Sequence, residues 1–339
     1  MRTHHRSSET KRSYCALGYR IHADVALEGL AAAEPASARG DPVSFCFVRE
    51  DVAWPPVDPG ATFHPECDVT EALPANALVL ANTGARVWDW YTAFDDLPMT
   101  RVRCDLVERS ITMSCGEDLD RFRISYHLIS PVLPYWARRD GRLGLHAAVI
   151  ALDGSAVVIL GDKTMGKSTL CAAFHKRGHA IWSDDVAVIT PDLRSVYRGS
   201  GMLRTSEDTA QAILGDGVRL RKCSFSKHVM DTGPASAAGE PEALPIAAIF
   251  HLSPFSDDPS LRIIRLHDPL ARMAVLRNLG STAFPAPPAI REGEFLAATA
   301  LAGATPVFRV IRPRDLAVLP ETVEQILRFA REVDGAHVQ

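Results

Sequence analysis

The chain has 339 residues, of which 47% are hydrophobic and 23% charged, a balance typical of globular proteins long enough for two domains. Its formal net charge of -4 argues against nucleic acid as a partner, because nucleic-acid-binding surfaces are usually basic. No apolar run reaches the roughly 18 residues that would predict membrane insertion. The seven cysteines are scattered without a C-x-x-C pair, so we expect a cytoplasmic protein without zinc or a disulfide framework.

The N-terminal third predicts an α+β module. Residues 1–13 are rich in basic side chains and lack the apolar core of a signal peptide, so we interpret them as a disordered arm. A helical pattern at 119–139 should bend or break at Pro131 and Pro134. Before it, β-like runs separated by turn residues lie at 42–50, 76–81, 85–92, 99–107 and 109–114. The module at 14–139 is either purely structural or a scaffold for an acceptor.

The pattern changes near Gly144, and residues 140–339 are predicted to form a second domain. Two β-like runs flank Asp153-Gly154, a dipeptide typical of two-residue hairpin turns. A helix should follow at 167–178 and end at Gly178, and small residues with proline predict a mobile loop at 231–245. Strands are predicted at 180–190, 246–253, 261–267 and 306–313, and helices near 268–279, 294–303 and 320–333. The fold class is therefore α/β.

The stretch "ILGDKTMGKSTL" at 159–170 matches the phosphate-loop pattern G-x-x-x-x-G-K-[ST]. In this motif, backbone N–H groups converge on phosphate oxygens at the N-terminus of a helix. Lys167 is predicted to reach the β- and γ-phosphates, and the Ser168 hydroxyl to ligate Mg²⁺. The strand before the motif and the helix after it support the match. The predicted nucleotide-binding residues are Gly161, Asp162, Lys163, Thr164, Met165, Gly166, Lys167, Ser168 and Thr169.

An acidic pair, Asp184 and Asp185, follows in "WSDDV". One helix and one return strand should bring it back to the phosphate loop. Neighbouring residues of an extended strand point to opposite sides, so one carboxylate can hold Mg²⁺ while the other faces an incoming hydroxyl. Two carboxylates beside a polyphosphate imply a cation. The alternative is a surface Asp-Asp turn.

His146 is the third candidate. If Asp153-Gly154 forms a two-residue turn, Leu152 pairs with Ser155, and counting outward places His146 opposite Gly161. There the imidazole can hydrogen-bond an aspartate and tune its proton affinity. A purely structural histidine is the alternative.

Residues 145–189, with the histidine, the hairpin, the phosphate loop, "KRGH" and the aspartate pair, resemble the catalytic domain of bacterial HPr kinase/phosphorylase. PEP carboxykinase shares the wider architecture. The resemblance implies ATP and Mg²⁺ as cofactors, Asp184 as general base supported by His146, and Asp185 with Ser168 around the metal. It is compatible with a homo-oligomer, since HPr kinases assemble as hexamers. "YRGSGM" at 197–202 is similar to the family motif "IRGxGI", but Val196 stands where a glutamate is expected, which weakens the case for the reverse phosphorylase reaction.

The whole chain, including "GYRIHADVALEGL" at 18–30, is similar to the HPr-kinase-like proteins of lasso-peptide gene clusters. This resemblance implies phosphorylation of a precursor peptide, typically at its C-terminal serine. Arg204 and Lys227 are candidate contacts to a phosphate or an acceptor carboxylate.

The leading hypothesis is a Mg²⁺/ATP-dependent kinase acting on a Ser/Thr hydroxyl of a peptide or protein, with neither nucleic acid nor membrane as a partner. Two alternatives remain open. One is a small-molecule kinase of PEP-carboxykinase-like ancestry, and the other is a nucleotide-binding sensor without transfer.

Overall fold

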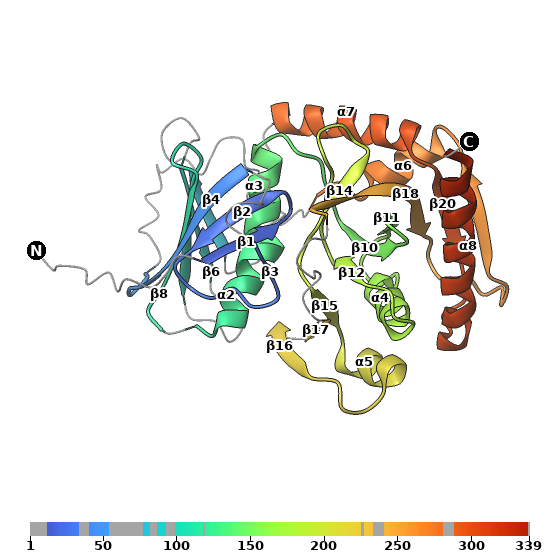
Figure 1. The fold of residues 1–339 in the computed structure, drawn as a ribbon, viewed down its shortest axis with the longest axis horizontal. Helices are drawn as coiled ribbons and strands as arrows, with labels where there is room; N and C mark the ends of the chain where they lie inside the picture. Colours follow the sequence, from blue (N-terminus) through green and yellow to red (C-terminus); the bar gives the residue numbers. More distant parts are fainter. Residues whose placement is uncertain are drawn as a thin grey trace, which may run out of the picture.

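The computed structural model describes residues 12–33, 41–53, 77–81, 87–92, 99–117, 119–224, 227–232, 241–280 and 288–337. Within these residues the chain is a mixed α/β structure built on two large sheets, with a helical segment between them (Figure 1). The predicted fold class is thus confirmed at the level of α/β. The helices in the described part of the chain are all too short or too polar to cross a membrane.

The first sheet has eight strands in the order β3-β1-β2-β4-β8-β7-β6-β5. Burial alternates strictly along β2, as expected for a strand with one face on a core. The five predicted strands are confirmed within a few residues. Arg12 and Ser13 lie in β1, so the predicted arm at 1–13 is wrong for its last two residues, and residues 1–11 lie outside the described chain. The strands are β1 (Arg12–Ala16), β2 (Tyr19–Ala23), β3 (Ala31–Ala32), β4 (Asp41–Arg49), β5 (Ala77–Ala81), β6 (Val87–Thr92), β7 (Thr100–Asp105) and β8 (Ser110–Cys115).

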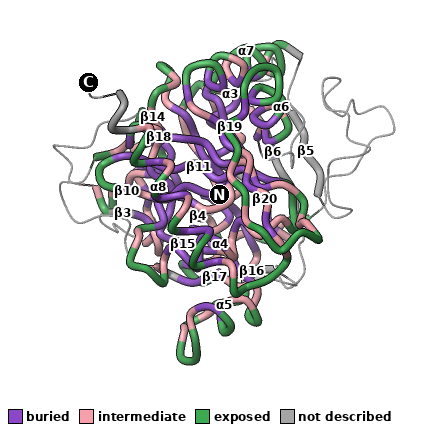
Figure 2. Tube along the Cα trace, turned by 90° about the vertical axis from the view of Figure 1, so that its right-hand side faces the viewer, coloured by how far each residue is buried: buried purple, intermediate pink, exposed green. Residues whose placement is uncertain are grey.

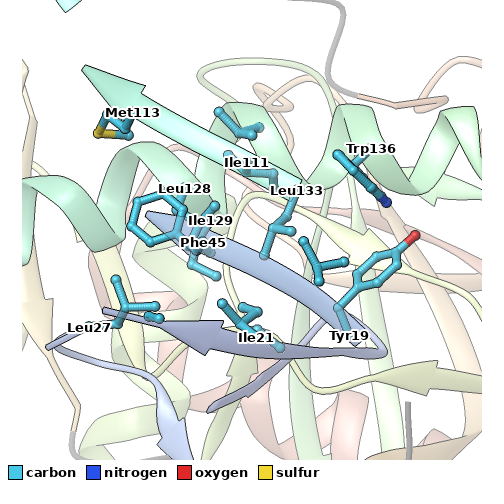
Figure 3. Packing of buried hydrophobic residues seen from close by; sticks show 14 of the residues in the cluster. Tyr19, Ile21, Leu27, Phe45, Ile111, Met113, Leu128, Ile129, Leu133 and Trp136 are labelled. Atoms are coloured by element: carbon cyan, nitrogen blue, oxygen red, sulfur yellow. The ribbon is translucent and has the colours of Figure 1, made fainter. Parts of the chain in front are cut away.

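The predicted helix at 119–139 is one continuous segment made of α2 (Arg121–His127), the π-helical turn η2 (Leu128–Val132) and α3 (Leu133–Arg139). The expected interruption is confirmed at Pro131, where the π turn η2 separates the two α-helical parts. Pro131 lies in the π turn, and Pro134 is the second residue of α3. The segment packs its apolar face against the first sheet, with Leu133 and Trp136 above Tyr19 and Ile21 (Figure 3).

The second sheet has the order β12-β10-β11-β18-β20-β19, with β14 paired to β18. The hairpin register was predicted correctly, since Leu152 pairs with Ser155 and Ala147 with Leu160. The neighbours β11, β18 and β20 run parallel, so their carboxyl ends meet at one edge of the sheet. The strands are β10 (Ala147–Leu152), β11 (Ser155–Leu160), β12 (Ile181–Ser183), β14 (Ser195–Tyr197), β18 (Ala243–Leu252), β19 (Arg262–Leu266) and β20 (Val307–Ile311).

Helices cover both faces of this sheet. Figure 2 shows buried residues in the interior of the molecule and exposed residues on its outside. On one face pack α4 (Lys167–Lys176) and α8 (Leu319–His337), and on the other α6 (Leu270–Leu276) and α7 (Pro288–Ala304). The predicted helices are confirmed with shifted ends. The smaller elements are β9 (Gly144–Leu145), β13 (Ala187–Val188), β15 (Met202–Thr205), α5 (Glu207–Leu214), β16 (Leu220–Ser224), β17 (Lys227–Asp231) and η3 (Leu316–Val318).

The predicted loop at 231–245 is shorter than expected. Asp231 is the last residue of β17, and residues 243–245 already belong to β18. Residues 233–240 lie outside the described chain.

Buried polar contacts join the two sheet modules. The Arg142 guanidinium lies between the rings of Tyr19 and Tyr197, 4.2 and 5.1 Å from their centroids, and donates to the Gly18 carbonyl at 3.1 Å. Arg138 of α3 forms a buried ion pair with Glu294 of α7, with 2.5 Å between Nε and Oε1. Breaking such a pair leaves an uncompensated buried charge, so these contacts fix the junction between the modules.

Stability should fall at acid pH because of His127. Burial, assisted by the nearby Arg123 charge, lowers the pKa of His127 from 6.5 to about 4. Between these values the unfolded chain binds a proton that the folded chain does not, so the free energy of unfolding should drop by about 3 kcal/mol as pH falls from 7 to 4. Urea unfolding at several pH values measures this slope. His127→Phe should flatten the slope by that amount, and His267→Phe, at an exposed position, should leave it unchanged.

Candidate active site

The phosphate loop connects β11 to α4, as the sequence predicted. Gly166 is the N-cap of α4 with φ +80°, and a Cβ there would lie 2.6 Å from Nη2 of Arg312. Gly161 has φ +154°, and its Cβ would lie 3.1 Å from Cβ of Leu252. Both backbone conformations therefore favour glycine, and a Cβ at either position would crowd its neighbour.

Lys167 turns its ammonium into this loop. The side chain is buried, and Nζ donates to the carbonyl oxygens of Gly161 and Asp162, the latter at 3.3 Å. Lys163, one of the predicted nucleotide-binding residues, is exposed. Carbonyl oxygens are weak partners for an ammonium compared with phosphate oxygens, so Lys167 is placed to exchange them for an anion in the loop.

Asn278 holds the entrance of the loop and was missed in the sequence. It follows α6 and is 2% exposed. Its Oδ1 accepts from the Gly161 N–H at 3.0 Å, its Nδ2 donates to the Ala274 carbonyl at 2.9 Å, and its own carbonyl accepts from the His146 N–H at 2.8 Å. One residue, through its side chain and its backbone carbonyl, thus ties the ends of β9 and β11 together beside the loop. Asn278 lies far along the chain from β9 and β11, so no local sequence pattern predicts its contact with them.

The aspartate pair lies in a bend between β12 and β13, both side chains being half-buried. The expectation of two residues on opposite sides of an extended strand is wrong, because Asp185 has φ +77°, in the left-handed region. Both aspartates instead meet Arg204 of β15. The Arg204 N–H donates to Oδ2 of Asp184 at 2.7 Å, and its guanidinium pairs with Oδ2 of Asp185.

His146 contacts an aspartate as predicted, but the partner is Asp185. Its Nδ1 lies 3.0 Å from the Asp185 carbonyl oxygen and 3.4 Å from Oδ1 of the same residue. The resemblance implied support of Asp184, and the left-handed turn at Asp185 explains the difference because it brings the Asp185 backbone toward the imidazole. Burial lowers the pKa of His146, and the Asp185 carboxylate opposes this shift. The neutral imidazole is therefore favoured at neutral pH.

The residues fit a magnesium ion that is shared with phosphate oxygens. In the described part of the chain, His, Cys, Asp and Glu side chains form no group of three suited to a metal. Mg²⁺ in nucleotide sites needs only one or two protein oxygens and keeps phosphate and water as its other ligands. The Asp185 carboxylate and the Ser168 hydroxyl at the start of α4 are hard oxygen donors of this kind.

Arg312, a second residue that the sequence analysis missed, adds positive charge beside the loop. It follows β20, is 4% exposed, and donates to the Met165 carbonyl at 2.9 Å. Its guanidinium lies 4.8 Å from the Phe255 ring centroid. Burial lowers the pKa of Arg312 to about 10, which leaves it charged at neutral pH.

The two basic candidates differ in position. Arg204 lies at the centre of the site through its contacts with both aspartates. Lys227 is the first residue of β17 and pairs with Ser224, and its side chain lies outside what the structure describes. Val196, the residue before the "YRGSGM" motif at 197–202, is buried. Within the motif, the Arg198 guanidinium stacks 4.3 Å from the Trp182 ring centroid.

Comparisons with known proteins do not identify a family for this chain. No family model matches the chain, and no curated protein matches it. Among solved structures, the Hpr(Ser) kinase/phosphatase from Coxiella burnetii matches with 17% identity and a TM-score of 0.26, over 56% of this chain and 98% of that one. A score of this size does not assign the chain to a family.

Asn278→Ala should loosen the loop. The substitution leaves the buried Gly161 N–H without its acceptor, which costs about 1–3 kcal/mol. Urea unfolding should show this loss, and tripolyphosphate should bind more weakly by calorimetry. Arg277→Ala changes the exposed neighbouring residue and serves as the control. Unchanged stability and anion affinity in Asn278→Ala would show that Asn278 does not hold the loop.

Proposed function

We propose that this protein is a Mg²⁺/ATP-dependent kinase that phosphorylates a Ser or Thr hydroxyl of a peptide or protein. The observation that supports it most is the placement of Asp184 in the wall of a pocket, next to the Asp185–His146 pair, with the charge of the phosphate-loop lysine acting on the same His146. A proton acceptor, a cation ligand and a phosphate-binding lysine in one place are the groups that phosphoryl transfer needs.

The residues divide the work as follows. Backbone N–H groups of 161–169 and Lys167 bind the phosphates, and Asp185 with Ser168 holds Mg²⁺, which neutralises charge on the β- and γ-phosphates when bound. The acceptor oxygen forms a bond to the γ-phosphorus while the bond from that phosphorus to the bridging oxygen breaks. Asp184 accepts the hydroxyl proton, and its orientation is set by the hydrogen bond from the Arg204 N–H.

His146 acts through Asp185. Its ring contacts both the carbonyl and the carboxylate of that residue, so it fixes the turn that presents the carboxylate. Arg312 and Lys167 offset phosphate charge from two sides of the loop.

We propose to test first an acceptor peptide with a C-terminal serine. Lasso precursor peptides carry such a serine, and the sequence resembles the kinases that act on them. A small-molecule acceptor and nucleotide sensing without transfer are the competing outcomes.

The test is a transfer assay read by mass spectrometry. The protein, Mg²⁺ and ATP are incubated with synthetic peptides that end in Ser, Thr or Ala. We expect the mass of one phosphoryl group to be added to the Ser or Thr peptide and not to the Ala peptide. Asp184→Asn should lower the rate at least about 100-fold, as loss of a general base does, while ATP affinity is kept.

Asp192→Asn provides the matched control, because it makes the same change at an exposed turn. ATP binding without transfer to any peptide would favour a sensor or a small-molecule kinase. Full activity in Asp184→Asn would remove this residue from the proposed role of base.

A further inference from the structure

The aspartate pair and the phosphate loop lie at the same edge of the second sheet. β11 and β12 both pair antiparallel with β10, so they run in the same direction and their carboxyl ends reach this edge. Asp184 and Asp185 follow β12 and therefore mark one flank of the loop, together with the pocket that Ser130 and Arg204 line. The reacting end of a nucleotide belongs on this flank, beside the proposed proton acceptor and metal ligand.

The opposite flank is formed by the segments that follow β18 and β20, which continue the sheet on the other side of β11. Two backbone hydrogen bonds hold these segments together. The Ser253 N–H donates to the Val310 carbonyl, and the Ser256 N–H to the Arg312 carbonyl, both at 3.0 Å. Ligands of parallel sheets bind outside the carboxyl ends of the strands. A nucleotide whose γ-phosphate points toward the aspartates therefore extends its sugar and base toward this second flank.

Phe255 places an aromatic ring on the second flank. It lies in the segment after β18 and is half-buried. A Cβ built on Gly166, the N-cap of α4, would lie 3.6 Å from Cζ of Phe255, so the ring borders the phosphate loop itself. A ring that is partly open to solvent beside a phosphate site is suited to base stacking, because every nucleobase has a π-face.

Two arginines lie beside this ring and differ in how they are held. The Arg312 guanidinium is 4.8 Å from the Phe255 centroid, is buried, and is tied to the loop by its hydrogen bond to the Met165 carbonyl. The Arg314 guanidinium is 5.9 Å from the same centroid and belongs to an exposed residue. Arg314 can therefore move away from the ring and admit a flat group, on which a guanidinium stacks as it does on an aromatic side chain.

We propose that the base of a purine nucleoside triphosphate binds between the Phe255 ring and the Arg314 guanidinium, on the flank of the loop opposite the aspartates. The inference rests on the proposed kinase function, since it takes a nucleoside triphosphate as the ligand of the loop. It adds the residues that recognise the nucleoside. A purine is the expected class because its two fused rings offer more surface to an aromatic side chain than a pyrimidine does.

A comparison of a nucleotide with a bare triphosphate isolates the contribution of the base. The Mg²⁺ complexes of AMP-PNP, a non-hydrolysable ATP analogue, and of tripolyphosphate are titrated into the full chain by calorimetry. Phe255→Leu keeps an apolar side chain and removes the π-face. We expect this variant to bind AMP-PNP about tenfold more weakly, the loss typical of one stacked base, and to bind tripolyphosphate as the wild type does.

Two further variants control for the change at Phe255. Phe295→Leu makes the same substitution at an exposed position of α7 and should alter neither affinity. Phe255→Trp keeps a stacking surface and should retain the AMP-PNP affinity to within about threefold. Equal weakening of both ligands in Phe255→Leu would show that the ring supports the loop and not the base. That result, or an unchanged AMP-PNP affinity, would overturn the proposal.

Arg314→Gln separates stacking on the base from binding of phosphate. If the guanidinium covers the base, AMP-PNP binds several-fold more weakly and tripolyphosphate binds as before. A similar loss for both ligands would place Arg314 on the phosphates and contradict its proposed role. Arg291→Gln removes the same charge from an exposed position of α7 and should change neither affinity.

Fluorescence gives a readout that does not depend on affinity. The chain has five native tryptophans, so the emission of Phe255→Trp is compared with that of the wild type. At saturating concentration, AMP-PNP should quench the variant more than the wild type, because the base contacts the new indole. Tripolyphosphate should quench both proteins equally. Equal quenching of the two proteins by AMP-PNP would contradict a contact between the base and position 255.

The two proposals fail separately. Transfer to a peptide, combined with an AMP-PNP affinity that does not respond to Phe255→Leu, would remove this inference alone. An affinity for AMP-PNP that depends on Phe255, without transfer to any acceptor, would keep the base site and remove the kinase.

Discussion

The parallel pairing of β11, β18 and β20 is the constraint on which the site depends. Each strand ends at the same edge of the sheet, so the phosphate loop after β11 meets the segment after β18 and Arg312 after β20. Residues 147 positions apart in the chain, Met165 and Arg312, are brought to hydrogen-bonding distance in this way. At this edge a Cβ on Gly161 would press on Leu252, and one on Gly166 on the end of the Arg312 side chain.

Charge is balanced internally around this edge. Lys167 rests on loop carbonyls, and Arg204 on the two aspartates. A half-buried carboxylate and a half-buried guanidinium stabilise each other at the site that we propose holds a polyphosphate and a cation. Internal pairing of this kind keeps the geometry ready for its ligands, and binding becomes an exchange of partners.

The sequence predicted those parts of the structure that are set by local pattern. The hairpin register followed from Asp153-Gly154, and the phosphate loop from spacing with a strand before and a helix after it. The short strand β3 was missed, since a pair of residues carries no periodicity.

The site was predicted less completely, because contacts between distant segments leave no trace in a local pattern. Asn278 and Arg312 reach the loop only through the sheet topology, and Arg204 meets both aspartates only through the placement of β15. The partner of His146 depended on one backbone angle at Asp185. An aspartate tolerates the left-handed region better than most residues, but an aspartate in the sequence does not by itself predict that conformation.

The π turn η2 has a consequence for how the junction is built. A π turn holds one residue more than a regular helical turn, and each residue advances a helix by about 100° of rotation. The extra residue shifts the direction faced by Ser130, at the pocket, relative to that faced by Leu133 and Trp136, which pack on the first sheet. One inserted position thus lets a single helical segment serve two surfaces at once.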